Sequence, residues 1–133
     1  MIRYANENDV EIISKYDKHI SKEELENIIR LQRVIVMFED NTFIGWLRYN
    51  LFWDNTPFMN MLYLLDNERG KGKGSQLVAF WENEMKNKKY EFVLTSTQSN
   101  EEAQFFYRKL GYIDSGSLLL PNEPLEIILY KKL

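Results

Sequence analysis

The spacing of apolar side chains predicts a chain in which helices and strands alternate. Residues 21–33 carry one apolar stripe, and Ser21 with Glu24 forms a capping box at its start. The stripe consists of Leu25, Ile28, Ile29 and Gln32. Residues 34–38 (VIVMF) follow as a continuous apolar run, which is typical of a buried strand, and residues 39–42 (EDNT) predict a turn.

The rest of the chain divides in the same way. Strands are predicted at residues 1–5, 43–53, 58–66, 90–97, 117–121 and 125–132. Helices are predicted at residues 6–19, 75–88 and 100–111. In the second of these, pairs of Glu82 with Lys86 and Glu84 with Lys88 would support the outer face. We expect one α/β domain over residues 1–133, with a mixed β-sheet flanked by helices.

Composition narrows the class of protein. The 133 residues are 44% hydrophobic and 28% charged, which indicates a globular chain. Its net charge of −3 and pI near 5.3 argue against a nucleic-acid partner. The chain has no cysteine, which excludes a disulfide scaffold, a thiolate metal site and a cysteine nucleophile. We find no signal peptide and no membrane-length apolar run, and expect a cytoplasmic protein without a membrane partner.

One segment combines flexibility with positive charge directly before a predicted helix. Residues 68–81, ERGKGKGSQLVAFW, hold three glycines, one arginine and two lysines within seven positions. Glycine lets a backbone approach a ligand, and a helix N-terminus offers unpaired N–H groups, so the segment predicts an anion cradle. Neither a Walker P-loop nor a Rossmann turn fits its spacing. The pattern R-x-x-G-x-G does fit, at Arg69, Gly72 and Gly74; a surface loop without a ligand is the alternative.

A second segment follows one strand later. In residues 95–112, TSTQSNEEAQFFYRKLGY, Asn100 precedes a helix, and Tyr107 lies on its apolar stripe. Asn100 as a plain N-cap and Tyr107 as a core side chain are the alternatives to a functional role.

Together these two segments, in residues 61–112, resemble the GNAT N-acetyltransferases. The resemblance implies a splayed sheet that receives acetyl-CoA between its fourth and fifth strands. The backbone of residues 70–75 would hold the pyrophosphate, the strand at residues 62–64 would pair with the pantetheine arm, and Tyr107 would lie beside the thioester sulfur as the catalytic residue. The implied coenzyme site comprises Leu62, Tyr63, Leu64, Arg69, Gly70, Lys71, Gly72, Lys73, Gly74, Ser75, Asn100 and Tyr107.

The general base is left open. An amine near the lysine pKa of about 10.4 is mostly protonated at pH 7 and needs a base or a water chain. Some members of the family carry a glutamate where this chain has Thr95. Asp54 and Glu126 are candidates, although each also reads as a plain surface carboxylate, and His19 reads as structural or exposed. Neither the acceptor nor a metal is indicated, and we expect no metal.

Aromatic side chains gather in residues 46–58 and would either line an acceptor pocket or belong to the core. We expect an acetyl-CoA-dependent N-acetyltransferase that acts by direct transfer to a primary amine. The alternative is a non-catalytic GNAT-fold acyl-CoA binder that acts as a sensor or partner-binding module. The oligomeric state stays open, with a homodimer as one option.

Overall fold

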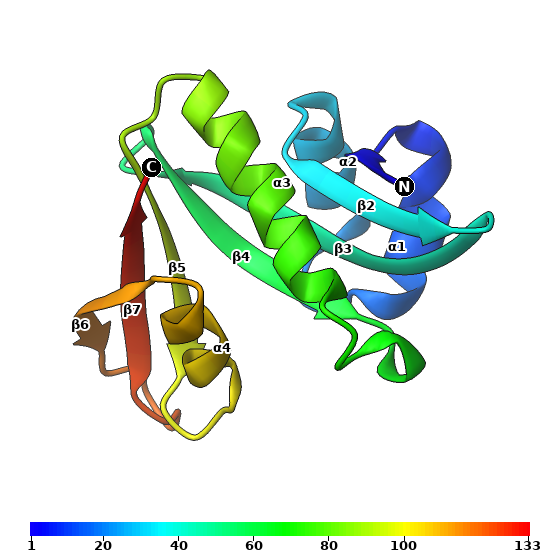
Figure 1. Ribbon diagram of the computed structural model, residues 1–133. Helices are drawn as coiled ribbons and strands as arrows, with labels where there is room; N and C mark the ends of the chain where they lie inside the picture. The colour runs from blue at the N-terminus through cyan, green and yellow to red at the C-terminus, as the bar shows by residue number, and fades with distance from the viewer. The chain divides into compact units, whose positions relative to one another are not determined.

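The computed structural model describes all residues, 1–133, as an α/β fold with a seven-stranded mixed sheet and four helices (Figure 1). The strands are β1 (Ile2–Tyr4), β2 (Val34–Glu39), β3 (Thr42–Phe52), β4 (Thr56–Leu64), β5 (Phe92–Gln98), β6 (Ile113–Leu118) and β7 (Glu126–Lys132). The helices are α1 (Val10–Tyr16), α2 (Lys22–Arg30), α3 (Lys73–Asn87) and α4 (Ala103–Lys109). The strand order is β1-β2-β3-β4-β5-β7-β6, which confirms the predicted fold class.

The chain forms two compact units. The first contains residues 1–50 and 61–81, and the second contains residues 51–60 and 82–133. In the first unit β2 pairs antiparallel with both β1 and β3, and Val36 lies opposite Trp46. No helix of the chain has the combined length and apolar character that crossing a bilayer requires.

Helices cover both faces of the β1–β3 sheet. Val36 and Trp46 face α1 and α2, where they join a buried cluster with Ile13 and Leu25. The opposite face meets α3, because the Tyr49 ring lies 5.8 Å from the Trp81 ring. Since burial of each large apolar side chain contributes about 1.5–3 kcal/mol, these two layers supply most of this unit's stability.

A buried ion pair ties the α1–α2 connection to β3. Asp17 Oδ2 accepts hydrogen bonds from Arg48 Nε at 2.7 Å and from Trp46 Nε1 at 3.1 Å. Asp17 Oδ1 accepts from the His19 backbone N–H at 3.1 Å. Burial alone raises the pKa of Asp17, but Arg48 and these hydrogen bonds hold that pKa below its usual value. The carboxylate therefore stays charged inside the protein.

In the second unit β5 is the central strand. It pairs in parallel with β4, where Phe58 lies opposite Leu94 and Met59 opposite Thr95, and antiparallel with β7. Glu82, at the C-terminal part of α3, accepts bonds from the Tyr112 hydroxyl at 2.8 Å and from Lys131 Nζ at 3.0 Å. The predicted pair of Glu82 with Lys86 is therefore wrong, because Glu82 faces the sheet side of its helix.

Several predicted boundaries also shift. The strand predicted at residues 117–121 is β6, which begins at Ile113 and ends at Leu118. The helix predicted at 6–19 is a short 3₁₀ turn, Glu7–Asp9, followed by α1. Gln32 does not belong to the α2 stripe, because the helix ends at Arg30 and Gln32 has a φ of 57°. The Ser21 cap is confirmed, since Ser21 Oγ accepts from the Glu24 N–H at 3.1 Å.

Candidate functional site

The glycine segment forms a tight loop between the end of β4 and the start of α3. A 3₁₀ turn, Asp66–Glu68, leaves the strand, and Gly70 and Gly72 then take left-handed φ angles of 76° and 78°. A Cβ built on either glycine would meet no atom within 4 Å. Only glycine adopts this backbone without strain, and the open space beside it lets a ligand approach the main chain.

The loop ends in an unpaired helix N-terminus. Gly72 immediately precedes α3, and its carbonyl accepts the bond from the Gln76 N–H at 3.2 Å. The N–H groups of the first turn, which includes Lys73, Gly74 and Ser75, have no partner within the helix. Aligned N–H dipoles at a helix start carry a partial positive charge, so this backbone suits a phosphate group.

The lysines of the loop are already paired with carboxylates. Lys73 Nζ, mostly buried, donates to Glu68 and, at 3.1 Å, to Glu39 on β2, and Lys71 Nζ lies 3.9 Å from Glu68. The hydrogen bond between Glu68 and Lys73 lowers the pKa of Glu68 and raises that of Lys73. Because these side-chain charges largely cancel, the backbone is left as the main attraction for an anion.

Arg69 links the loop to the last residues of the strand β4. Its Nε donates to the Leu64 carbonyl at 3.1 Å, and its guanidinium lies 4.8 Å from the centre of the Tyr63 ring. Its Nη2 also lies 3.6 Å from Asp66. Arg69 thus has partners within the loop and strand.

Sequence reasoning missed Gly45 on β3. A Cβ at Gly45 would lie 2.6 Å from the Tyr63 carbonyl oxygen and 2.6 Å from Leu64 Cδ2. Only a residue without a side chain lets the two backbones approach so closely. A glycine inside a long apolar strand is itself the signal that could have identified this contact.

In the second unit Tyr107 is buried on α4. It is 6% exposed, and its ring packs against Phe106 and Tyr112 at centroid distances of 5.2 and 5.6 Å. Burial raises the pKa of the Tyr107 hydroxyl to about 12, although a hydrogen bond with Thr95 acts in the opposite direction. The hydroxyl is therefore neutral at physiological pH and carries a proton that it can donate.

Thr95 is a structural bridge between strands. It is buried, and its Oγ1 donates to the Met59 carbonyl at 3.0 Å. Thr95 also acts on the neighbouring Tyr107 hydroxyl, whose pKa it lowers against the larger effect of burial. Because Thr95 is buried and its hydroxyl is bonded to the Met59 carbonyl, Thr95 cannot serve as a general base.

The remaining candidate residues from the sequence differ in their exposure to solvent. Asn100 lies in an exposed turn, and the N-cap position of α4 falls on Glu102, so Asn100 does not cap the helix. Of the aromatic group, Trp46 and Tyr49 are buried in the core, while Trp53 is 75% exposed. His19 is exposed, as predicted.

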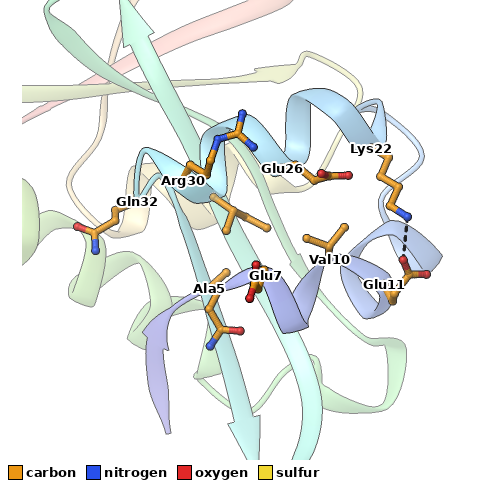
Figure 2. Close-up of a pocket in the computed structure, with 10 residues that line it drawn as sticks. Ala5, Glu7, Val10, Glu11, Lys22, Glu26, Arg30 and Gln32 are labelled. Carbon is orange, nitrogen blue, oxygen red and sulfur yellow. Dashed lines mark hydrogen bonds and ion pairs between the residues drawn. The ribbon is translucent and has the colours of Figure 1, made fainter.

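One surface hollow does not involve any predicted site residue. It has a volume of about 640 Å³ and lies between α2 and the segment that joins β1 to α1 (Figure 2). Its floor is apolar, with Ala5, Val10 and Ile29, and at one end Lys22 donates to Glu11 at 2.9 Å. A second hollow, of about 290 Å³, lies beside the β3–β4 turn and Lys89.

Comparison with known proteins places these features in one family. The model of the acetyltransferase (GNAT) family matches residues 5–112. A GNAT acetyltransferase structure from Bacillus cereus is 24% identical and aligns over 99% of this chain and 96% of that chain, with a TM-score of 0.79. The PaiA N-acetyltransferase of Thermoplasma acidophilum, solved in complex with coenzyme A, is 21% identical and aligns over 100% and 98%, with a TM-score of 0.82.

A ribosomal-protein-alanine N-acetyltransferase from Brucella melitensis is 20% identical and aligns over 100% of this chain and 99% of that chain, with a TM-score of 0.80. At these identities the likeness to solved structures establishes a shared fold. No curated protein matches the sequence.

Proposed function

We propose that this chain, which belongs to the GNAT acetyltransferase family, moves an acetyl group from acetyl-CoA to a primary amine by direct transfer. The observation that carries the proposal is the left-handed pair Gly70 and Gly72 directly before the unpaired start of α3. The structure of a relative in complex with coenzyme A supports the choice of coenzyme.

Within the proposal, residues 70–75 bind the pyrophosphate through backbone N–H groups. The open space at Gly70 and Gly72 fits this role, since a Cβ at either position would extend into free volume beside the main chain. Neutral donors carry most of the contact because Glu68 and Glu39 already offset the loop lysines. Raising the salt concentration should therefore weaken coenzyme binding only modestly.

The strand at residues 62–64 contributes backbone groups to the pantetheine arm in the same proposal. Arg69 already donates to the Leu64 carbonyl, so that carbonyl has a partner before any coenzyme binds. Gly45 fixes the position of this strand, because its backbone touches Tyr63 and Leu64 directly.

Acetyl-CoA supplies an activated acyl group in the form of a thioester. The neutral amine nitrogen attacks the carbonyl carbon, a C–N bond forms, the C–S bond breaks, and the electron pair leaves on sulfur. Tyr107 donates a hydrogen bond to that sulfur as its negative charge develops, and the proton lost by the amine ends on the released thiol or in solvent. The absence of cysteine from the chain removes the usual acyl-enzyme route.

Thr95 favours the second candidate, a non-catalytic GNAT-fold binder of acyl-CoA. Its hydroxyl is committed to Met59, and the general base has no assigned residue. If the chain is a sensor or partner-binding module, it will bind acetyl-CoA without transferring the acyl group. If it is an enzyme, the amine loses its proton to a water chain or to an acidic residue elsewhere.

The experiment that separates these candidates is a screen of primary amines for release of the coenzyme A thiol. The panel includes small amines, polyamines, aminoglycosides and peptides with free N-termini or lysines. Thiol release that requires an amine and equals the amount of acetylated amine by mass spectrometry supports the enzyme. Binding of acetyl-CoA with no release by any amine class supports the binder.

A further inference from the structure

Glu68 is a mostly buried carboxylate next to the loop that is proposed to bind an anion. It ends the 3₁₀ turn Asp66–Glu68, where its N–H donates to the Leu65 carbonyl at 2.8 Å. The side chain of Glu68 is 16% exposed, whereas that of Asp66 in the same turn is 90% exposed. Because like charges repel, a carboxylate beside residues 70–75 should by itself weaken the binding of a phosphate group.

The partner of Glu68 is Lys73, the first residue of α3. Lys73 Nζ donates to Glu68 Oε2, and the Lys73 side chain is only 12% exposed. The four residues between the two partners, 69–72, include both left-handed glycines. The ion pair therefore closes a ring across the loop, from the turn before it to the helix after it. Water and salt screen such a partly buried pair less than an exposed one.

Glu39 links the same lysine to the sheet. It is the last residue of β2, and each of its carboxylate oxygens lies 3.1 Å from Lys73 Nζ. Lys73 thus joins α3, the turn before the glycine loop and the end of β2, all within the first compact unit. Two carboxylates share one ammonium, so this cluster supplies no net positive charge to a phosphate.

We infer that Glu68 is a positioning residue for the coenzyme loop: by holding Lys73 across residues 69–72, it keeps the backbone N–H groups in the arrangement that binds the pyrophosphate. The inference rests on the proposed function, since it takes this loop as the pyrophosphate site. Glycine loses more conformational freedom on ordering than any other residue. The ion pair restrains Gly70 and Gly72 before the coenzyme arrives, which lowers the cost of ordering the loop on binding.

The substitution Glu68→Gln separates positioning from simple charge, because the two effects have opposite signs. Glutamine keeps the shape of the side chain and removes its negative charge. If Glu68 acts on the pyrophosphate only by charge, the variant should bind acetyl-CoA more tightly. If Glu68 positions the loop, the variant should bind more weakly although a repulsive charge is lost. A loop in the binding conformation about a tenth of the time raises the apparent dissociation constant about 10-fold, which is the expected change.

Asp66→Asn is the matched control, because it removes an equal charge from the same turn. Asp66 is exposed and lies 3.6 Å from Arg69 Nη2, so its charge does not close the ring. The control should bind acetyl-CoA within about 2-fold of the wild type, as expected for an exposed ion pair. Calorimetric titration of acetyl-CoA into the three full-length proteins gives the comparison. Unchanged or tighter binding by Glu68→Gln would overturn the inference, and so would equal weakening in the control.

Backbone amide order parameters from NMR relaxation of the ligand-free proteins give a readout that a general loss of stability would not. Gly70 and Gly72 should have values of about 0.85 in the wild type and in Asp66→Asn, and below about 0.6 in Glu68→Gln. The values in β2 and α3, and the melting temperature, should stay close to those of the wild type. Glycines that remain ordered in Glu68→Gln, or order lost throughout the chain, would overturn the inference.

The two measurements also separate this inference from the proposed function. A wild-type protein that does not bind acetyl-CoA would refute the proposed function. The order parameters need no ligand, so they would still decide whether Glu68 holds the loop. Binding by the wild type together with unchanged affinity in Glu68→Gln would leave the proposed function intact and refute the role of Glu68.

Discussion

Replacing Tyr107 with phenylalanine removes one hydroxyl and leaves the ring in place. The ring contacts with Phe106 and Tyr112 should survive, and Thr95 keeps its own bond to the Met59 carbonyl. The lost hydrogen bond to Thr95 should cost about 1 kcal/mol of folding stability, the usual value for a single neutral bond. The variant should therefore fold and bind acetyl-CoA within a few fold of the wild type.

The effect on turnover should be much larger. Full proton transfer from a phenol of pKa about 12 to a thiolate of reference pKa near 8.5 is uphill by roughly 5 kcal/mol. Tyr107 is thus expected to act by a hydrogen bond that strengthens as charge develops on sulfur, not as a proton donor. Tyr107→Phe should reduce turnover by about 10²–10³, the loss typical of removing one hydrogen-bond donor from charge that develops in the transition state.

The pH dependence of stability gives a second readout of the same residue. The folded-state pKa of Tyr107 is about 12 and its unperturbed value is 10.0. This difference favours the folded protein fully below pH 10, and about 3 kcal/mol is lost as pH rises from about 10 to about 12. Thermal melts across this range should fall less steeply for Tyr107→Phe than for the wild type.

Tyr112→Phe is the matched control. Tyr112 is equally buried, but its hydroxyl donates to Glu82 at 2.8 Å and does not contact Thr95. It should lose stability and keep its turnover on a competent amine. Equal losses of turnover in the two variants would mean that Tyr107 acts only through packing. Turnover of Tyr107→Phe near the wild-type value would refute the role assigned to its hydroxyl.

Three further changes test the surroundings of the site. Gly45→Ala should destabilise the protein by about 1–3 kcal/mol in thermal melts and weaken acetyl-CoA binding, because its Cβ would displace Tyr63; unchanged affinity would argue against the role of β4. Lys89→Gly should stabilise by about 1 kcal/mol in urea unfolding, since Lys89 lies just after the end of α3 and has a left-handed φ of 74°; a loss of stability would contradict that strain argument. Arg48→Leu should cost about 3–5 kcal/mol by leaving the Asp17 carboxylate buried without its partner, whereas a cost below 1 kcal/mol would mean that Asp17 is neutral.

Helices and strands with a clear local sequence pattern could be predicted from the sequence. The limits of α3 were predicted within two residues, because its apolar spacing and the glycines before it both indicate where a helix begins. The same holds for β2, a continuous apolar run bounded by turn residues. The glycine loop was located for the same reason, since glycine spacing reports backbone geometry directly, and Gly70 and Gly72 do have left-handed φ angles.

Features that depend on distant partners were not predictable. The strand β6 has no apolar alternation in residues 113–118, IDSGSL, and only its ladder with β7 defines it as a strand. Glu82 appeared to be a surface residue because Tyr112 and Lys131, its partners, come 30 and 49 positions later. The interaction between Tyr107 and Thr95 likewise joins a helix to a strand, and the sequence pattern of neither segment indicates it.

Calorimetric titration of acetyl-CoA into three proteins tests most directly the claim that the loop at residues 70–75 holds the coenzyme. Gly72→Asp and Gly72→Asn impose the same left-handed strain of about 1–2 kcal/mol and differ by one charge. With both variants folded by thermal melt, binding should be strong in the wild type, weakened in Gly72→Asn, and absent in Gly72→Asp, whose carboxylate would face the pyrophosphate. Wild-type affinity in Gly72→Asp would contradict the account.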